Sequence, residues 1–383
     1  PKTGMDRPTY QGVSLDEFTA GNDRIMWTKS YYDEWTETCA KILEDPKYAG
    51  RFIMPAHGYN MYDFEKSTAF LRMFIDHGSP LIEEWYLFER DTEEQAWVYI
   101  NESGAAIEHR WKKEIPGYTE MAIKLISYLQ REMWNPGVNF KVHLEIQVEH
   151  FATRPEFFGL GGIAAYSSYN CNNEEYVRWF SELCRHYGLE GNTERLGTDP
   201  YEPDQISNPD FIDGTKNWTL QPAEKDSMIV KSHKGYATMQ EREPFRPWTA
   251  ISFLWTRRSA EKPNVFSQEI RNLEAGRLYI ARVWIGDYTD LKAGKLKGKK
   301  CAVNIRVDGG DVWDDWYRTR AYRGKKSNMF TARGCQVQQI IFRAKGPTAT
   351  LVISDWESDA EPGGAIGQEL IFNNIDVHPF LEP

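Results

Sequence analysis

The chain has 383 residues, of which 41% are hydrophobic and 27% are charged, and its net charge is −10. This length is enough for two domains of ordinary size, each with its own core, and the composition is that of a globular protein. No run of about 18 apolar residues occurs, so no membrane span is predicted. The one concentration of basic residues, Lys292–Lys300, is interpreted as a solvated loop, and nucleic acid is not an expected partner.

Strand and helix signals alternate through residues 1–190. We expect strands at Tyr10–Phe18, Arg51–Tyr59, Pro80–Phe88, Phe140–Phe151 and Gly162–Asn170, and helices at Tyr31–Leu43, Phe64–Ile75, Tyr118–Met133 and Glu174–Tyr187. This alternation is typical of βαβ units around a parallel sheet. A complete (β/α)8 barrel needs about 250 residues. We therefore interpret this α/β domain as the C-terminal part of such a barrel, whose earlier strands lie outside this sequence, with a small layered α/β domain as the alternative.

The second half of the chain has a different pattern. Residues 191–207 contain Gly, Pro, Asp and Asn and few apolar residues, which predicts a linker or an extended seam. Over residues 208–383 short alternating runs replace the helical periodicity, at Ser227–Ser232, Trp248–Trp255, Leu278–Trp284, Cys301–Val307, Val337–Phe342, Thr348–Ser354 and Leu370–Val377. Seven or more strands separated by turns predict an antiparallel β-sandwich or jelly roll, so the fold class is α/β plus all-β.

Two short stretches at the ends of this all-β region carry a family resemblance. The region opens with Asn208-Pro209-Asp210-Phe211, Asp213-Gly214 and Trp218, and it closes with Phe372-Asn373-Asn374-Ile375-Asp376-Val377. These stretches resemble the first and last strands of the calcium-stabilised β-sandwich carbohydrate-binding modules. Since such strands lie side by side, we expect Asp210 and Asp376 to approach each other and to share a structural calcium ion. The alternative is that Asp210 and Asp213 only form hydrogen bonds within turns.

A second resemblance lies at the ends of the strands expected in the α/β domain. Barrels of this type hold their catalytic residues at the C-terminal ends of the strands. The side chains expected there include Asp16, Glu17, His57, Tyr59, Glu84, Trp85, Tyr86, Glu149 and Tyr166. This clustering of acids, histidine and aromatic rings resembles the glycoside hydrolase barrels. The resemblance implies one acid after the fourth strand and another after the seventh, which correspond here to Asp16-Glu17 and to Glu145 or Glu149.

The resemblance to glycoside hydrolases assigns expected roles to these residues. The expected strand Phe140–Phe151 has a polar face with Glu145 and Glu149, which lines either a barrel interior or the solvent at a sheet edge. Glycosidases use two carboxyl groups, about 5–5.5 Å apart in retaining enzymes and about 6.5–9.5 Å apart in inverting ones. We expect Glu17 to be the general acid and Glu149 the nucleophile or base, with Glu145 as a substitute. The residues expected to contact sugar are Asp16, His57, Tyr59, Glu84, Trp85 and Tyr86.

Aromatic residues make up 14% of the chain, including 14 Trp and 20 Tyr. Their flat faces pack well against the C–H faces of sugar rings. Trp313 and Trp316 lie in the charged stretch Asp311–Tyr322, which we expect to be a loop that either binds glycan or packs on the α/β domain. The sequence thus predicts a secreted or cell-surface protein that binds polysaccharides or oligosaccharides and hydrolyses their glycosidic bonds.

The alternative function is non-catalytic glycan binding or assembly, with a degenerate barrel. In that case another chain or a second copy is expected to complete the α/β domain, because an open parallel sheet exposes its edges. No motif for a nucleotide or another organic cofactor occurs, and none is expected. The five cysteines leave at least one thiol unpaired, and Cys301 and Cys335 either form a disulfide or remain buried thiols.

Overall fold

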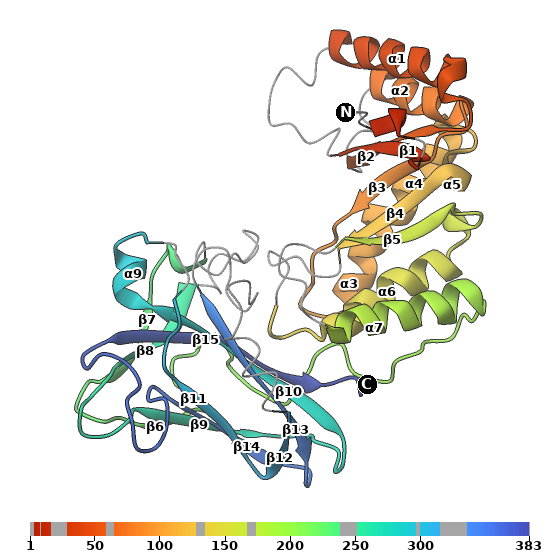
Figure 1. Cartoon of the computed structure of the whole chain (residues 1–383). Helices are drawn as coiled ribbons and strands as arrows, with labels where there is room; N and C mark the ends of the chain where they lie inside the picture. The colour runs from red at the N-terminus through yellow and green to blue at the C-terminus, as the bar shows by residue number, and fades with distance from the viewer. Residues whose placement is uncertain are drawn as a thin grey trace.

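The computed structural model describes residues 4–7, 9–16, 29–58, 65–127, 135–166, 174–237, 251–295, 299–314 and 335–382. In these ranges the chain forms an α/β domain with a parallel sheet and an antiparallel β-sandwich (Figure 1). Residues 190–218 connect the two parts without forming a helix or a strand. None of the described helices is both long enough and apolar enough to cross a membrane.

Five strands form the parallel sheet, in the order in which they occur along the chain: β1 (Gly12–Leu15), β2 (Phe52–Gly58), β3 (Leu81–Trp85), β4 (Ala122–Ser127) and β5 (Gly162–Tyr166). All neighbouring strands in this order are parallel. Connections between such strands are right-handed, so strands that always add on the same side place all their helices on one face. This is the arrangement of part of a (β/α)8 barrel, and strands β1–β5 with their helices are called the half-barrel below.

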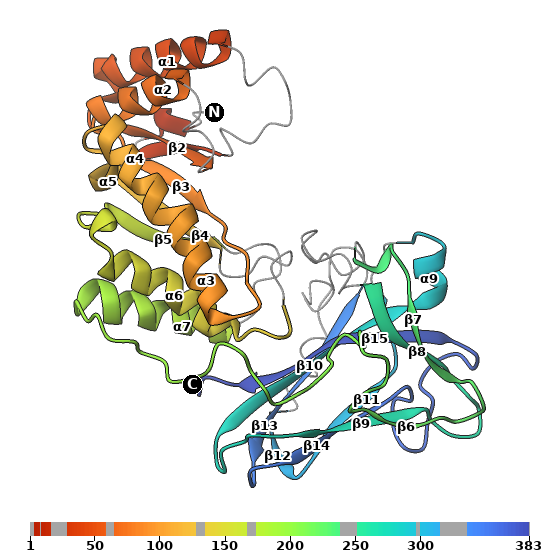
Figure 2. The same cartoon turned by 180° about the vertical axis from the view of Figure 1, so that it is seen from behind.

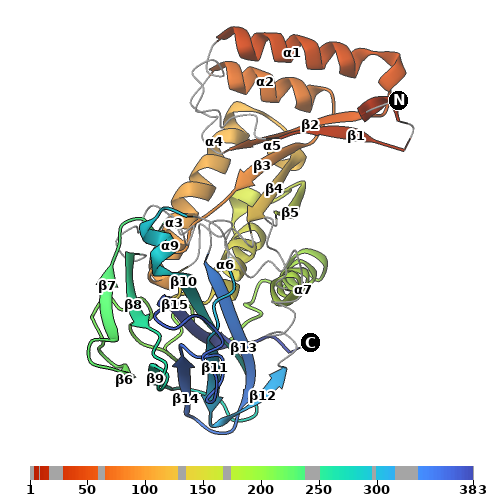
Figure 3. The same ribbon diagram turned by 60° about the vertical axis from the view of Figure 1, so that its left-hand side comes forward.

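The helices described in the half-barrel are α1 (Lys29–Glu44), α2 (Glu65–Asp76), α3 (Glu93–Ile100), α4 (Ala106–Glu114), α5 (Tyr118–Met121), α6 (Phe140–Thr153) and α7 (Glu174–Leu183). Helices α3 and α4 lie behind the sheet in Figure 1 and in front of it in Figure 2. Helices α1 and α2 pack side by side, above β1 and β2 in Figure 3. The core lies between the sheet and these helices, where Leu81, Trp85 and Ile126 are buried.

The expected strand Phe140–Phe151 is wrong, because this segment forms the helix α6. Asn139 caps the helix by accepting a hydrogen bond at its Oδ1 from the Lys141 amide, at 3.2 Å. Every side chain from Phe140 to Val148 is buried, so α6 has no face toward solvent. Such a helix lacks the amphipathic periodicity of 3.6 residues, and its alternating polar and apolar residues instead match the pattern of a β-strand.

The expected helix Tyr118–Met133 is also wrong over the part that the structure describes. One helical turn, α5, is followed directly by the strand β4, and residues 128–134 lie outside the described ranges. Buried residues alternate in β4 with half-buried ones, so both faces are largely apolar, as in many parallel strands. A short apolar run of this kind does not distinguish a buried strand from a buried helix. Helices α3 and α4 were not predicted.

The β-sandwich has ten described strands in two sheets. The six-stranded sheet has the order β12 (Gly310–Asp314), β13 (Gln336–Ala344), β10 (Leu278–Asp287), β15 (Glu369–Pro379), β8 (Ser252–Arg257) and β7 (Met228–Ser232). The four-stranded sheet has the order β11 (Asn304–Asp308), β14 (Ala349–Ser354), β9 (Val265–Ile270) and β6 (Thr219–Gln221). A short helix, α9 (Tyr288–Lys292), follows β10. The seven predicted runs coincide with β7, β8, β10, β11, β13, β14 and β15, whereas β6, β9 and β12 were missed.

The segment expected to open the sandwich as a strand forms a looped turn instead. The Asn208 side chain closes this loop, because its Nδ2 donates to the Gly214 carbonyl at 3.0 Å and its Oδ1 accepts from the Asp213 amide at 3.1 Å. The Trp218 indole donates to the Asn208 carbonyl at 3.1 Å. The spacing of Asn208, Asp213-Gly214 and Trp218 therefore specifies a closed loop, and the first strand of the sandwich, β6, begins only after it.

The outer face of the six-stranded sheet packs against helix α7. Arg282 on β10 donates through Nη2 to the Tyr176 hydroxyl of α7 at 3.2 Å. The same guanidinium donates through Nη2 and Nε to Asp376 Oδ2 on β15, at 2.8 and 3.0 Å. All three side chains are buried. The half-barrel and the sandwich are thus joined through a buried polar contact and not only through the connecting chain.

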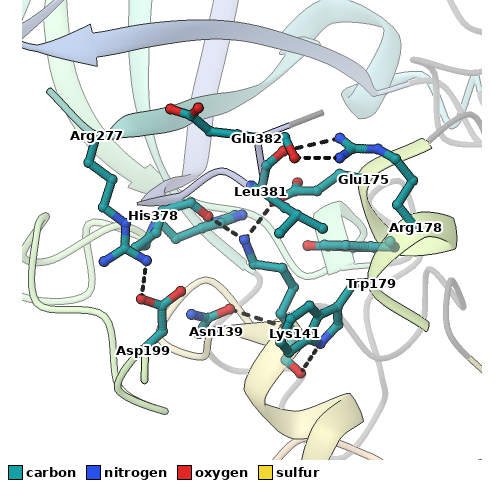
Figure 4. Close-up of polar contacts among 12 residues, drawn as sticks. Asn139, Lys141, Glu175, Arg178, Trp179, Asp199, Arg277, His378, Leu381 and Glu382 are labelled. Atoms are coloured by element: carbon teal, nitrogen blue, oxygen red, sulfur yellow. Dashed lines mark hydrogen bonds and ion pairs between the residues drawn. The ribbon is translucent and has the colours of Figure 1, made fainter. Parts of the chain in front are cut away.

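The C-terminal residues extend this contact onto α6 and α7 (Figure 4). The Lys141 ammonium of α6 donates to Glu175 Oε1 at 2.6 Å and to the Pro379 carbonyl at 2.5 Å. The Leu381 amide also donates to Glu175 Oε1, at 2.9 Å, and Arg178 donates to the Leu381 carbonyl at 3.0 Å. The end of β15 is therefore fixed on the helix layer of the half-barrel.

Candidate functional site

An aromatic pair lies at the C-terminal edge of the half-barrel sheet. Tyr86 follows β3 and Tyr166 ends β5, and their ring centroids are 5.7 Å apart with an interplanar angle of 36°. Tyr166 is exposed and Tyr86 is half-buried. The Tyr86 hydroxyl lies 3.5 Å from Glu84 Oε1, and Glu84 belongs to β3 itself. The structure therefore brings the predicted residues Glu84 and Tyr86 together with Tyr166, to which the sequence assigned a strand end but no role.

Glu84 faces away from the helix layer. Along β3 the buried residues Leu81, Glu83 and Trp85 alternate with the half-buried residues Ile82 and Glu84. Successive side chains of a strand point to opposite faces, so Glu84 lies on the face that the helices leave uncovered. This is the face that would line the interior of a closed barrel.

Asp16 lies at the same edge of the sheet, in the turn after β1, and is exposed. Leu15 pairs with Pro55, and Gly58 pairs with Glu84, so Asp16 and Glu84 belong to strands separated by one intervening strand. Two strand spacings correspond to about 10 Å, and the register places Asp16 level with Ile82, two residues before Glu84, so the two Cα atoms are about 12 Å apart. Of the other predicted site residues, Glu17, Tyr59 and Trp316 lie outside the described residues.

Trp85 is a core residue and not a contact for sugar. Its side chain is 1% exposed and lies edge-on to Phe151 and Phe157, with ring centroids 5.5 and 6.1 Å away. The π-helical turn Asn101–Ala105 brings Gly104 against the indole so closely that a Cβ atom there would collide with it. Trp85 follows Glu84 on the strand and therefore points to the opposite, helix-covered face.

His57 is buried as well, and it belongs to a polar network between the sheet and the helices. His57, Glu83 and Lys124 are direct neighbours on β2, β3 and β4. The Lys124 ammonium lies 2.5 Å from Glu83 Oε2 and 2.6 Å from Glu108 Oε2 of helix α4. The Tyr118 hydroxyl donates to Glu83 Oε2 at 2.6 Å and lies 3.2 Å from His57 Nε2. These five residues are called the buried network.

The charges of the buried network stabilise one another. Burial alone would raise the pKa of Glu83, but the positive charge of Lys124 and the hydrogen bonds to Glu83 hold it below its ordinary value. Burial would lower the pKa of Lys124, and the carboxylates of Glu83 and Glu108 overcome this effect and raise it. Burial lowers the pKa of His57, which favours the neutral imidazole. The network has no exposed member, so it holds the sheet against α4 and α5 rather than binding a ligand from solvent.

Glu145 and Glu149 do not lie at a strand end, because both belong to helix α6. Glu145 is buried, and its Oε1 accepts hydrogen bonds from the Leu196 and Gly197 amides at 2.6 and 3.0 Å and from the Tyr187 hydroxyl at 3.1 Å. It therefore anchors the connecting segment to the helix layer. Glu149 is half-buried, and burial raises its pKa, against the opposing effect of Arg195. The expected pairing of Glu149 with Glu17 at the strand ends is thus wrong in its placement of Glu149.

Two other residues of α6 make stability depend on pH. Burial lowers the pKa of both His143 and His150 to about 4, whereas an unfolded histidine titrates near pH 6.5. Below pH 6.5 the unfolded chain binds protons that the folded chain does not, so stability is lost as the pH falls. We expect the free energy of unfolding in urea to decrease steadily from about pH 6.5 to about pH 4. His143→Gln should reduce this slope, and the exposed His109→Gln should not; a flat profile for the unmodified protein would contradict the prediction.

Asp210 and Asp376 have different hydrogen-bond partners in the described structure. Both oxygens of Asp376 are occupied, because Arg282 donates to them and His378 Nδ1 lies 2.9 Å from Oδ2. Asp210 accepts a hydrogen bond at Oδ1 from the Asn374 amide, at 3.1 Å. Within the described ranges no group of three His, Cys, Asp or Glu side chains is arranged to hold a metal ion. The donor set therefore does not fit a calcium ion between these two carboxylates, because the Arg282 guanidinium already neutralises Asp376.

The centre of the outer face of the six-stranded sheet is not open to a glycan. Trp255 and Trp284 on this face are 5% and 6% exposed and pack against Tyr236, Leu291 and Cys335. Arg282, on the same face, contacts α7 as described above. Trp313 is the predicted sandwich residue that remains exposed, at 42%; it lies on β12 with its ring centroid 6.2 Å from that of Phe380. Trp313 therefore covers the end of β15, next to the contact between the domains.

The cysteines are buried or half-buried thiols where the structure describes them. Cys301 and Cys335, which the sequence left as a disulfide or two thiols, are two buried thiols that do not bond to each other. Cys301 belongs to the core between the two sheets and Cys335 to the cluster on the outer face of the six-stranded sheet. Burial raises the pKa of the Cys301 thiol to about 12, so this thiol is unreactive at neutral pH.

No family model and no curated protein matches the sequence. Among solved structures, the enzymatically active domain of bacteriophage CBA120 tailspike protein 4 has a TM-score of 0.28 and 12% identity, over 46% of this chain and 21% of that one. A family 61 carbohydrate-binding module in complex with β-1,4-galactotriose has a TM-score of 0.24 and 14% identity, over 46% of this chain and 97% of the module.

A third solved structure covers more of the chain. It is a family GH115 4-O-methyl-α-glucuronidase with specificity for decorated arabinogalactans, and it has a TM-score of 0.23 and 9% identity, over 76% of this chain. The present chain spans 34% of that enzyme and 21% of the tailspike protein. The second and third of these structures are a carbohydrate-binding module and a glucuronidase, and the low TM-scores transfer no residue role to this chain.

Proposed function

We propose that this protein binds glycans at the C-terminal edge of the half-barrel sheet and hydrolyses them there. The observation that supports the proposal is the Tyr86 and Tyr166 pair beside Glu84, on the face that the helices leave uncovered. Aromatic rings pack on the C–H faces of sugars, and a carboxyl group is the acid or base that glycosidases use. A polysaccharide ligand implies a secreted or cell-surface protein, and this location is part of the proposal.

Hydrolysis needs a second carboxyl group, and we assign it to the turn after β1. Asp16 lies there, and the predicted general acid Glu17 follows it in the sequence. The Cα atoms of Asp16 and Glu84 are about 12 Å apart, and side chains that reach toward each other would bring the carboxyl groups to the separation of about 6.5–9.5 Å used by inverting enzymes, which leaves room for a water molecule. In this proposal Glu84 takes the role of general base that the sequence assigned to Glu149.

The test is the release of reducing ends from galactan, xylan and homogalacturonan by the full chain. We expect Glu84→Gln to lower the rate at least about 100-fold, because a general base typically contributes this much. Tyr166→Ala should weaken substrate binding with less effect on the maximal rate. The matched control is Glu149→Gln, a half-buried carboxyl group on α6 that should retain activity. Activity of Glu84→Gln equal to that of the unmodified protein would sink the proposal.

Assembly without catalysis is the second candidate. Among the described strands, β1 and β5 each pair with one neighbour, so the half-barrel has two open edges that another chain or a second copy could cover. The docked outer face of the six-stranded sheet also fits a structural role for the sandwich. This alternative predicts that the unmodified protein releases no product from any of the three polymers.

A further inference from the structure

The Lys231 ammonium group, on the edge strand of the sandwich, contacts aromatic rings rather than a carboxylate. Lys231 Nζ of β7 is 3.3 Å from the centroid of the Trp255 ring and 5.1 Å from that of Tyr288. Across the described residues Lys231 has no ion pair. Cation–π contacts stabilise an ammonium group but leave its N–H donors available for an anion.

Two further cations lie near Lys231, and each has a carboxylate partner, Glu369 for Lys292 and Glu224 for Arg257. Lys292 Nζ lies 4.6 Å from the centroid of the Tyr288 ring and 3.2 Å from Glu369 Oε2, and Arg257 is on the neighbouring strand β8. Burial lowers the pKa of Lys231, and Lys292 and Arg257 lower it further, against the opposing charge of Glu369. An anion that binds to the Lys231 ammonium is also attracted by Lys292 and Arg257.

Apolar surface lies directly beside these cations. Ile229 is 40% exposed and pairs with Trp255 across β7 and β8. Tyr288 is half-buried at the start of α9, and the Trp255 indole N–H is buried with no hydrogen-bond partner in the described structure. A sugar ring that carries an anionic group offers both complementary parts, a C–H face for the apolar surface and an anion for the ammonium groups.

We propose that Lys231, Lys292 and the Tyr288 ring form a subsite for an acidic saccharide, separate from the site at Glu84. The inference rests on the proposed function in one respect, that the ligand is a glycan. It adds the chemical class of that glycan, because an anionic group forms stronger, charge-assisted hydrogen bonds with the two ammonium groups than a neutral hydroxyl does. The subsite lies on β7, the edge strand of the six-stranded sheet, which leaves it accessible while the centre of the same face is covered.

Binding of the full chain to acidic and neutral polymers tests the subsite. Isothermal titration calorimetry measures the affinity of the protein for the acidic polymers homogalacturonan and dextran sulfate and for the neutral polymers galactan and dextran. We expect the acidic polymers to bind more tightly, with an affinity that falls as salt is added. Lys231→Met should weaken their binding about tenfold or more, which is the effect of losing one charge-assisted contact. Lys231→Arg should retain most of it, and Lys292→Gln should also weaken it.

The control is Lys262→Met, which removes an exposed lysine from a loop elsewhere on the sandwich and should change nothing. Equal affinity of Lys231→Met and the unmodified protein for homogalacturonan and dextran sulfate would overturn the inference, as would equal affinity of the unmodified protein for acidic and neutral polymers. Glu84→Gln should retain the preference for acidic polymers. If the proposed function at Glu84 is wrong, Glu84→Gln still releases product. If the proposed subsite is wrong, Lys231→Met binds the acidic polymers as tightly as the unmodified protein does.

Discussion

Replacing Lys124 by methionine is expected to destabilise the protein by about 3–5 kcal/mol, the cost of removing one partner from a buried ion pair. The substitution leaves the Glu83 and Glu108 carboxylates buried without the ammonium group that lies 2.5 and 2.6 Å from them. One or both must then take up a proton or draw water into the core, and either change favours the unfolded chain. The measurement is the free energy of unfolding in urea at pH 7, followed by circular dichroism.

The matched control is Lys41→Met, which removes an ion pair with Glu37 in which both side chains are largely exposed. Exposed pairs contribute little, so this variant should unfold at nearly the same urea concentration as the unmodified protein. Replacing Lys124 by methionine together with Glu83→Leu and Glu108→Leu should recover much of the lost stability, because a buried ion network can be replaced by apolar groups. A loss in Lys124→Met no larger than in Lys41→Met would show that the network contributes nothing.

The buried network also shows what the sequence could not reveal. His57, Glu83 and Lys124 are far apart in the chain and are neighbours only because β2, β3 and β4 pair in one register. The sequence placed His57 at a strand end, which is correct, and assigned it to sugar binding, which its burial excludes. Which face of a strand a residue occupies depends on where the helices pack, and a parallel strand that is apolar on both sides carries no signal for that choice.

Local patterns predicted the sandwich strands well because one face of each meets the core. In β13 and β14 buried side chains dominate, and turn residues mark the ends, so the predicted runs lie within the observed strands or extend one residue beyond them. The prediction for the α6 segment was wrong for the opposite reason, since this helix is buried on all sides and its polar residues have partners inside the protein. Glu84 and Tyr86 were predicted correctly as neighbours at a strand end, because the position of a residue along a strand is a local property.

The second large effect is expected at the contact between the two domains. Replacing Arg282 by methionine should also cost about 3–5 kcal/mol, because it leaves Asp376 buried without its cation. Burial would raise the pKa of Asp376, and the Arg282 guanidinium and His378 hold it below its ordinary value. Without Arg282, burial raises the pKa of Asp376 in the folded protein above that in the unfolded chain. The folded protein then keeps a proton that the unfolded chain releases, so the loss of stability should grow as the pH rises from 4 to 7. Urea unfolding at several pH values measures this dependence.

Two comparisons separate this explanation from a structural calcium ion. Arg282→Met together with Asp376→Asn removes both charges and should be more stable than Arg282→Met alone, whereas Arg306→Met, which breaks an exposed contact with Asp308, should behave like the unmodified protein. A chelator should leave the melting temperature of the unmodified protein unchanged, since the guanidinium and not a metal ion neutralises Asp376. A chelator that lowered the melting temperature would place an ion elsewhere in the sandwich, and a fully stable Arg282→Met would show that Asp376 has another source of positive charge.

Because Arg282 also donates to Tyr176 of α7, its loss should further expose the amides of α7 and of the end of β15 to hydrogen exchange. Exchange confined to the sandwich would mean that this guanidinium stabilises the sheet without joining it to the half-barrel.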